Sequence, residues 1–325
     1  MLNITKDKTK VLLQFNFFKT YTLKLVLIIT VTLFVCACSG NNNSTEVPEE
    51  IEDDQILDEQ TTPEEADESS YTLPEIDLNN WKVTLPVSEN GRPIEVEPPE
   101  ILNYANNEVL KPFMYNDSIN GALVFYTYPG ATTPNSSYSR TELREQMNPG
   151  SNSTNWTFKE GGRMKGTLSL DSISKDGDGD YHRTMVMQIH GRLTNEQRDL
   201  IGENDNNAPP MLKIYWQDGY IRVVTKALKD TSVSDTELLY TSAWEDGASH
   251  IFPDKVNFEK FSLEIKASEG KIEVVLNETE SKIFESVHID KWGVFENYFK
   301  AGNYLQSTDE DSYASVKYYK LDVVH

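Results

Sequence analysis

The sequence predicts an all-β fold, a jelly-roll sandwich of two mostly antiparallel sheets with a concave groove, from three observations. From Tyr71 onward, short runs rich in Val, Ile, Tyr, Phe, Trp and Thr alternate with clusters of Gly, Pro, Asn and Asp. No long helical period separates these runs, as is typical of a many-stranded sandwich. Two polar turns, Gln217-Asp218-Gly219 and Ser268-Glu269-Gly270, join neighbouring runs as hairpins, which indicates antiparallel pairing.

The elements can be assigned along the chain from these runs, and one helical turn is expected at Thr194 to Ile201. The predicted strands are Trp81 to Leu85, Ala122 to Tyr128, Arg140 to Gln146, Arg163 to Leu170, Thr184 to His190, Met211 to Trp216, Tyr220 to Thr225, Lys260 to Ala267, Lys271 to Leu276, Tyr298 to Gln306 and Ala314 to Val324. A groove on the open face of such a sandwich suits an extended polymer better than a small molecule.

The first 37 residues have the features of an export signal. Five lysines precede an apolar run, Leu25 to Ala37, that is too short for a comfortable membrane span. The run ends in Val35-Cys36-Ala37-Cys38-Ser39, which resembles a bacterial lipobox with Cys38 as the lipidated residue. We therefore expect an exported outer-membrane lipoprotein that faces the periplasm or the cell surface. An ordinary secretory peptide and an uncleaved anchor are the alternatives.

Residues 38–70 predict an acidic, disordered tether, which leaves residues 71–325 as the folded domain. The tether is rich in Asn, Ser, Thr, Pro, Glu and Asp and contains no Lys or Arg, so it cannot bury enough apolar surface to fold. The formal net charge of −22 argues against nucleic acid as a partner. A polyanionic ligand would need a local basic groove. Both cysteines precede the domain, which excludes structural disulfides within it.

The stretch Arg140-Thr141-Glu142-Leu143-Arg144 has the strongest functional pattern. On a strand, Arg140, Glu142 and Arg144 share one face while Thr141 and Leu143 share the other. Two guanidinium groups that flank one carboxylate could grip an acidic sugar. An exposed ladder of ion pairs explains this stretch equally well when it is taken alone.

Two further strands carry polar residues with the same alternation. Gln188 and His190 share one face of a strand and offer an amide and a base that titrates near neutrality. Near the C-terminus one row of alternate positions is mostly polar, and its Gly302 leaves room for a close approach to the backbone. That row consists of Tyr298, Lys300, Gly302, Tyr304 and Gln306.

The loop Asp176-Gly177-Asp178-Gly179-Asp180 could offer carboxylates to a calcium ion. It lacks the remainder of an EF-hand loop, including the glutamate at the twelfth position. A tight polar hairpin loop is therefore the preferred interpretation, and no metal site is predicted.

Three blocks together resemble the alginate lyases of polysaccharide lyase family 7. The family's signatures have the forms R-[ST]-E-[LV]-R, Q-[IV]-H and Y-F-K-A-G-x-Y-x-Q. This chain matches them in order with Arg140 to Arg144, Gln188 to His190 and Tyr298 to Gln306. With Ile76 to Pro86, which is also similar, the resemblance spans Tyr71 to His325. It implies a β-jelly roll and cleavage of alginate by β-elimination, without a metal or organic cofactor.

The resemblance also implies residue roles. Arg140 and Gln188 would neutralise the substrate carboxylate, with His190 as base and Tyr304 as acid for guluronate. For mannuronate Tyr304 could serve in both roles. Neighbouring sugars or the catalytic groups would be positioned by Glu142, Arg144, Tyr298, Lys300 and Gln306. Isoleucine at position 189 is associated with guluronate or mixed blocks.

Three alternatives remain open at this point. A non-catalytic alginate-binding lipoprotein would keep the carboxylate grip, although binding requires neither His190 nor Tyr304. A glycoside hydrolase needs two acidic residues at the scissile bond, and no strand motif supplies them. A lyase for another polyuronate, such as glucuronan, would use the same chemistry and differ only in the outer part of the groove.

Overall fold

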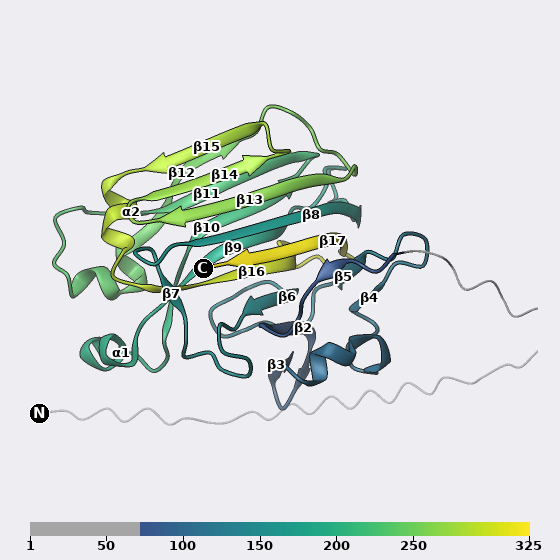
Figure 1. The fold of residues 1–325 in the computed structure, drawn as a ribbon, viewed down its shortest axis with the longest axis horizontal. Helices are drawn as coiled ribbons and strands as arrows, with labels where there is room; N and C mark the ends of the chain where they lie inside the picture. Colours follow the sequence, from purple (N-terminus) through teal and green to yellow (C-terminus); the bar gives the residue numbers. More distant parts are fainter. Residues whose placement is uncertain (1–71) are drawn as a thin grey trace, which may run out of the picture. The chain divides into compact units, whose positions relative to one another are not determined.

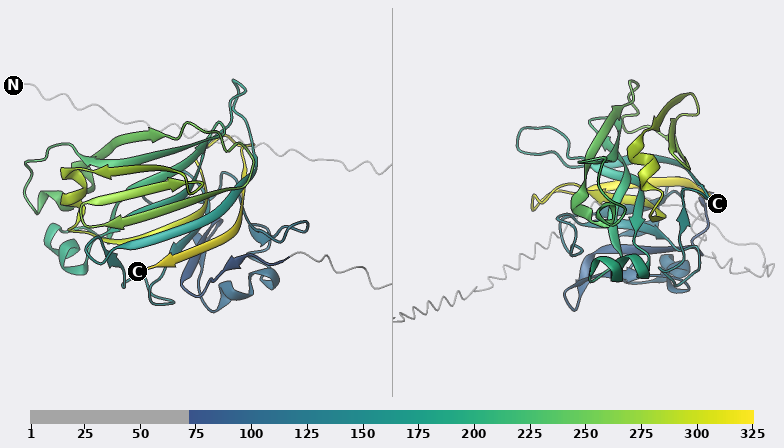
Figure 2. Two further views of the ribbon diagram at one scale, coloured as in Figure 1. Left: turned by 45° about the horizontal axis from the view of Figure 1, so that its top comes forward. Right: turned by 90° about the vertical axis from the view of Figure 1, so that its left-hand side faces the viewer.

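The computed structural model describes residues 72–325, so the predicted export signal and tether lie outside the described residues. Two sheets pack face to face (Figures 1 and 2). The eight-stranded sheet has the order β15 (Glu280–Glu285), β14 (Lys271–Leu276), β13 (Phe261–Ser268), β8 (Gly162–Ile173), β17 (Ala314–Val324), β5 (Leu123–Thr127) and β4 (Met114–Asn116), with β1 (Glu75–Ile76) parallel to β17.

The nine-stranded sheet brings the three predicted site strands next to one another. Its order is β12 (Trp244–Ile251), β11 (Tyr220–Leu228), β10 (Asn207–Gln217), β9 (Thr184–Arg192), β16 (Glu296–Leu305), β6 (Arg140–Glu145), β2 (Trp81–Glu89) and β3 (Arg92–Val96), with β7 (Trp156–Thr157) on β16. These pairings are antiparallel. The predicted two-sheet antiparallel jelly roll is confirmed.

Short helical segments connect the strands. The predicted turn at Thr194 is α1 (Asn195–Ile201), with a capping box between Thr194 and Gln197 and Gly202 in the left-handed conformation at its end. The sequence did not indicate α2 (Val287–Trp292), η1 (Glu100–Asn106), η2 (Glu237–Leu239) or η3 (Thr241–Ala243). No helix among residues 72–325 has the length and apolar character to cross a membrane.

Both predicted hairpin turns are present. Asp218 and Gly219 adopt φ of 53° and 85° between β10 and β11, and Gly270 adopts 70° between β13 and β14. The aspartate-glycine loop is a tight turn closed by an isolated antiparallel bridge between Lys175 and Tyr181, and Asp176 Oδ1 accepts the backbone amides of Asp178 and Asp180. Its first carboxylate therefore has a structural role within the turn.

The core lies between the sheets and follows the predicted alternation. Leu143 of β6 and Met187 and Ile189 of β9 are fully buried in it, opposite residues such as Phe125 of the other sheet. Thr141 also points inward and contacts the hydroxyl of Thr127 at 3.1 Å. The outer face therefore carries the even-numbered residues of β6 and, in β9, the even-numbered residues from Gln188 to Arg192.

A bulge interrupts the pairing of β16 with β9. Ala301 is opposite Met187 but Tyr304 is opposite Met185, so β16 has one extra residue there. Gly302 has φ of 132°, and a Cβ on it would lie 2.8 Å from the carbonyl oxygen of Thr141. The neighbour that approaches Gly302 closely is therefore strand β6. Strand β9 has its own bulge relative to β10, because the consecutive residues Ile214 and Tyr215 pair with Met187 and Met185, and Met185 lies on the outer face beside Tyr304.

The inner face of β6 holds a buried carboxylate, Glu145. It accepts hydrogen bonds from Trp156 Nε1 at 3.2 Å and from the backbone amide of Phe299 at 2.8 Å. His325 Nε2 lies 2.5 Å from its other oxygen. Burial alone would lower the pKa of His325, but the hydrogen bond and charge of Glu145 outweigh burial and raise it.

We predict that His325 stabilises the fold in its charged form. Because its pKa is raised on folding, this contribution is complete below the unfolded value of about 6.5 and is lost as pH rises through the folded value. Denaturant unfolding should show that the free energy of unfolding of His325→Ala is lower than that of the wild type. The difference should be on the order of 1 kcal/mol at pH 6 and smaller at pH 9.

His250→Ala is the matched control. Burial and then Lys282 lower the pKa of His250, so its effect on stability should change with pH in the opposite direction. The prediction would be contradicted if the difference in unfolding free energy between the wild type and His325→Ala were equal at both pH values.

Candidate active site

A groove of about 1050 Å³ runs over the outer face of the nine-stranded sheet. The residues that border it include six Lys and Arg side chains and three Asp and Glu side chains. The bases are Lys82, Arg140, Arg144, Arg192, Lys226 and Lys300, and the acids are Glu95, Glu203 and Asp205. A chain of net charge −22 therefore has the local basic groove that a polyanionic ligand requires.

A row of polar residues crosses this face at right angles to the strands. Each residue is the direct cross-strand partner of the next, and the row reads Lys82, Arg144, Lys300, Gln188 and Lys213. Like charges directly opposite one another destabilise a sheet. The row therefore needs carboxylates beside it, and the described residues supply one to each lysine.

Glu142 is the central carboxylate, and it is 1% exposed. Arg140 Nη1 donates to its Oε2 at 3.0 Å, Gln188 Nε2 donates to its Oε1 at 2.5 Å, and Lys300 Nζ forms a close ion pair with Oε2. The side chain of Glu142 is thus enclosed by protein groups. Glu142 therefore fixes the orientation of the Arg140 guanidinium, the Gln188 amide and the Lys300 ammonium beneath the groove.

The electrostatics of this cluster leave an excess of positive charge. Burial alone would raise the pKa of Glu142, but Lys300 and Arg140 outweigh it and keep the carboxyl ionised, with a lowered pKa. Burial, together with Arg140, lowers the pKa of Lys300 to about 8. Arg140 Nε is buried from solvent and has no hydrogen-bond partner among the described residues, so one donor of the guanidinium is left unpaired beneath the groove.

His190 lies on the same face as Gln188, and its ring borders the groove. Its Nδ1 is 3.0 Å from the carbonyl oxygen of Gly191. A carbonyl can only accept, so we assign the proton to Nδ1 and the lone pair to Nε2. Burial, and then the positive charge of Lys300, lowers the pKa of His190 to about 3. The imidazole is therefore neutral at neutral pH and can act as a base.

Tyr298 supports His190. The two rings stack with centroids 5.1 Å apart, and the Tyr298 hydroxyl lies 3.0 Å from His190 Nδ1. The guanidinium carbon of Arg144 lies 4.1 Å from the centre of the Tyr298 ring. Tyr298 thus connects His190 with Arg144.

Tyr304 lies further along β16, directly opposite Arg140 on β6. The Arg140 guanidinium carbon is 3.7 Å from the centre of its ring, and its hydroxyl is 2.5 Å from Ser136 Oγ. The ring also packs against Met185, which lies on the outer face. A phenol is thereby held next to the cationic cluster.

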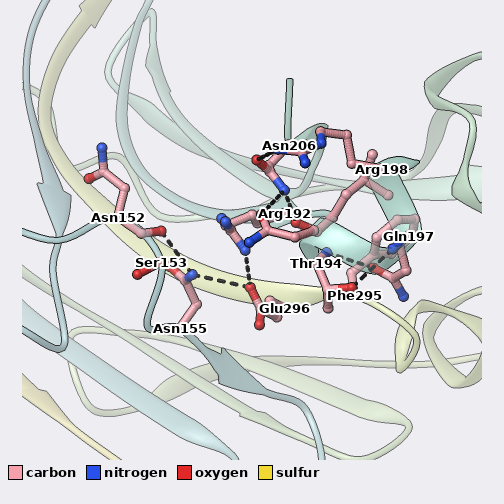
Figure 3. Close-up of polar contacts among 12 residues, drawn as sticks. Asn152, Ser153, Asn155, Arg192, Thr194, Gln197, Arg198, Asn206, Phe295 and Glu296 are labelled. Atoms are coloured by element: carbon pink, nitrogen blue, oxygen red, sulfur yellow. Dashed lines mark hydrogen bonds and ion pairs between the residues drawn. The ribbon is translucent and has the colours of Figure 1, made fainter. Parts of the chain in front are cut away.

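Arg144 and Arg192 are joined by a polar network at the ends of the strands. Arg144 Nη2 donates to Asn155 Oδ1 at 2.8 Å, and Asn155 Nδ2 donates to Glu296 Oε2 at 3.3 Å. Arg192 Nη1 donates to the same oxygen at 2.5 Å. Figure 3 shows both Asn155 and Arg192 directed at Glu296. The network holds two bases of the groove in place.

The structure brings most of the predicted site residues together. Arg140, Glu142 and Gln188 are in direct contact with one another or with Lys300, while Tyr298 joins His190 to Arg144 and Tyr304 packs on Arg140. Gln306 differs from the others. It follows the end of β16, and its side chain donates to the carbonyl of Tyr304. Of the predicted site residues, Arg140, Arg144, His190, Tyr298 and Lys300 border the groove, whereas Glu142, Gln188, Tyr304 and Gln306 do not.

Several residues of the groove were not singled out from the sequence. Arg192 continues the alternation of Gln188 and His190 and could have been found by extending that strand. Lys82 and Thr84 alternate with buried residues of β2 in the same way. Lys226 of the groove, and Ser136, which contacts the hydroxyl of Tyr304, carried no sequence signal, because their places depend on the packing of distant segments.

Two loops meet over the groove. Asn135, which precedes β6, and Asp205, which precedes β10, both border it, and Asn135 Nδ2 lies 3.5 Å from Asp205 Oδ2. The polar segment between α1 and β10 is therefore part of the groove wall.

Comparisons with known proteins agree with this geometry. Residues 76–325 match the family model described as alginate lyase. An alginate lyase of Klebsiella pneumoniae is 25% identical over 294 residues, which covers 77% of this chain and 89% of that protein. Among solved structures, the family-7 alginate lyase A1-II′ is 28% identical with a TM-score of 0.59, covering 76% of this chain and 95% of that chain.

A substituted form of A1-II′ in complex with the substrate GGMG is 25% identical with a TM-score of 0.61, covering 77% of this chain and 94% of that chain. The family model spans most of the sequence, and the solved structures share the two-sheet architecture. The chain therefore belongs to the alginate lyases of polysaccharide lyase family 7.

Proposed function

We propose that this lyase cleaves alginate by β-elimination in the groove, with Arg140 and Gln188 at the substrate carboxylate and His190 and Tyr304 as the proton-transfer groups. The observation that carries the proposal is the cluster around Glu142, where three donors are fixed beside a neutral histidine. This arrangement meets both chemical demands of the reaction.

The first demand is charge neutralisation. The proton on C5 of a uronate is a poor acid because the adjacent carboxylate is already negative and gains further charge in the transition state. Arg140 borders the groove, Gln188 is fixed beside it by the shared carboxylate of Glu142, and both side chains can donate to the substrate carboxylate. Lys300, held by Glu142, adds a nearby positive charge. The described residues thus offer fixed donors where the charge develops.

The second demand is a pair of proton transfers. For guluronate, His190 Nε2 takes the C5 proton, the electron pair of that bond forms the C4–C5 double bond, and the C4–O bond breaks. Tyr304 gives its proton to the departing O4. For mannuronate, Tyr304 serves in both roles. Each transfer contributes roughly 10²- to 10⁴-fold to the rate.

We infer a preference for guluronate or mixed blocks. The support is Ile189, which lies between Gln188 and His190 and is fully buried in the core. Its effect on the substrate would be indirect, through the position of the strand that carries both groove residues.

We also propose that the protein is an outer-membrane lipoprotein anchored through Cys38 and facing the periplasm or the cell surface. The support is the lipobox-like sequence before Cys38 and the acidic composition of the segment that follows.

Replacement of either proton-transfer group should abolish elimination. We expect His190→Ala and Tyr304→Phe each to lower kcat by at least about 10²-fold. The measurement is the ultraviolet absorbance of the conjugated unsaturated uronate during incubation of the full chain with polyguluronate, polymannuronate or glucuronan.

Matched controls are His250→Ala and Tyr126→Phe, which remove the same groups outside the groove and should behave as the wild type. Retention of near-normal activity in His190→Ala or Tyr304→Phe would contradict the proton-transfer roles of these two residues. Binding of alginate without any absorbance change in the wild type would instead indicate a capture protein.

The pH dependence of kcat/KM should have an alkaline limb near 8. Lys300 is charged below its pKa of about 8 and loses that charge as the pH rises, which weakens the neutralisation of the carboxylate. Lys300→Arg keeps the charge to higher pH, so it should move the limb upward. No acidic limb near 6.5 is expected, because the pKa of His190 is about 3. A limb near 8 that is unchanged in Lys300→Arg would rule Lys300 out as its source.

Removal of the proposed lipidation site should release the protein from the membrane. We expect wild-type protein produced in a Gram-negative host to incorporate labelled palmitate and to sediment with membranes. Cys38→Ser should do neither, whereas Cys36→Ser should behave as the wild type. Membrane association that persists in Cys38→Ser would indicate an uncleaved anchor.

A further inference from the structure

A second group of bases lies on the outer face of the nine-stranded sheet, away from Glu142. Lys213 of β10 is the cross-strand partner of Gln188, and Lys226 lies on the next strand, β11. Asp246 of β12 is the cross-strand partner of Lys226. Its carboxylate contacts Lys213 Nζ at 2.7 Å and Lys226 Nζ at 2.8 Å.

This cluster has more positive charge than its own ion pairs require. Two ammonium groups share one carboxylate, which leaves a formal excess of one positive charge. The two lysine side chains are only 11% and 15% exposed, whereas that of Asp246 is 55% exposed. One lysine would be enough to pair Asp246, so the second is not explained by the stability of the pair.

The position of Lys226 connects the cluster to the groove. Lys226 borders the groove together with Leu239 and Thr241 of the segment η2 to η3, at the opposite end from Lys82 and Glu95. Strands lie about 4.8 Å apart, so β11 is about 10 Å from β9 and its His190. A polymer that crosses the strands over the catalytic residues would therefore meet Lys226 beyond the sugars that react.

We propose that Lys226 and Lys213, held by Asp246, form an outer subsite that binds the carboxylate of a uronate unit outside the reacting pair. This inference rests on the proposed function and extends it to the recognition of longer chains. The subsite adds affinity for the polymer and takes no part in proton transfer.

The test compares substrates of two lengths. Lys226→Met removes the charge but keeps much of the aliphatic side chain. We expect it to raise the KM for alginate polymer about fivefold more than the KM for an alginate trisaccharide, the size of effect typical of one partly exposed ionic contact. In Lys226→Met the KM for the polymer should also increase less steeply with salt concentration than it does in the wild type.

Two further variants make the test specific. Lys165→Met removes a lysine from β8 of the other sheet, where it pairs with Glu278, and should leave the ratio of the two KM values unchanged. Asp246→Asn frees both ammonium groups and should lower the polymer KM.

The proposal is overturned if Lys226→Met leaves this ratio as in the wild type, or if Asp246→Asn raises the polymer KM as Lys226→Met does. The second result would identify the cluster as a structural ion pair only. Failure of the proposed function is distinguishable, because the wild type would then produce no absorbance from either substrate.

Discussion

The buried carboxylate of Glu142 is the interaction on which the site depends. Bases are placed side by side across neighbouring strands, and such a row is self-repelling unless anions lie within it. Glu142 supplies that anion and at the same time fixes Arg140, Lys300 and Gln188. A buried charge that loses its partners is strongly destabilising. The same contacts therefore hold the sheet together and keep the donors in a defined direction before substrate arrives.

The sheet order explains how distant segments of the chain form one site. Strand β16 lies between β6 and β9, so residues near positions 140, 190 and 300 become neighbours. The bulge at Gly302 lets β16 lie close to β6, and a bulge in β9 places Met185 on the outer face, where it packs on Tyr304. Glu145, one residue from Arg144, faces inward and is held by Trp156 and His325. The groove face and the core are thus coupled through alternate residues of the same strand.

Sequence patterns identified the interior strands and missed the edges. All four edge strands, β15 and β4 of one sheet and β12 and β3 of the other, were absent from the prediction. The strand β12 shows why: it is mostly exposed and reads Trp-Glu-Asp-Gly-Ala-Ser-His-Ile, without the apolar alternation that a buried face imposes. By contrast, β17 was predicted with its observed bounds, because its inner residues Val316 and Tyr318 are fully buried.

The sequence alone determined which residues share a face, because alternation within a strand is a local property of the backbone. That was enough to group Arg140 with Glu142 and Arg144, and Gln188 with His190. Only the tertiary structure decided which of these groups meet, because strand order and register depend on long-range packing. It enclosed Glu142 among protein donors and lowered the pKa of His190 through burial and Lys300. It also brought Lys226, which no local pattern marked, to the far end of the same groove.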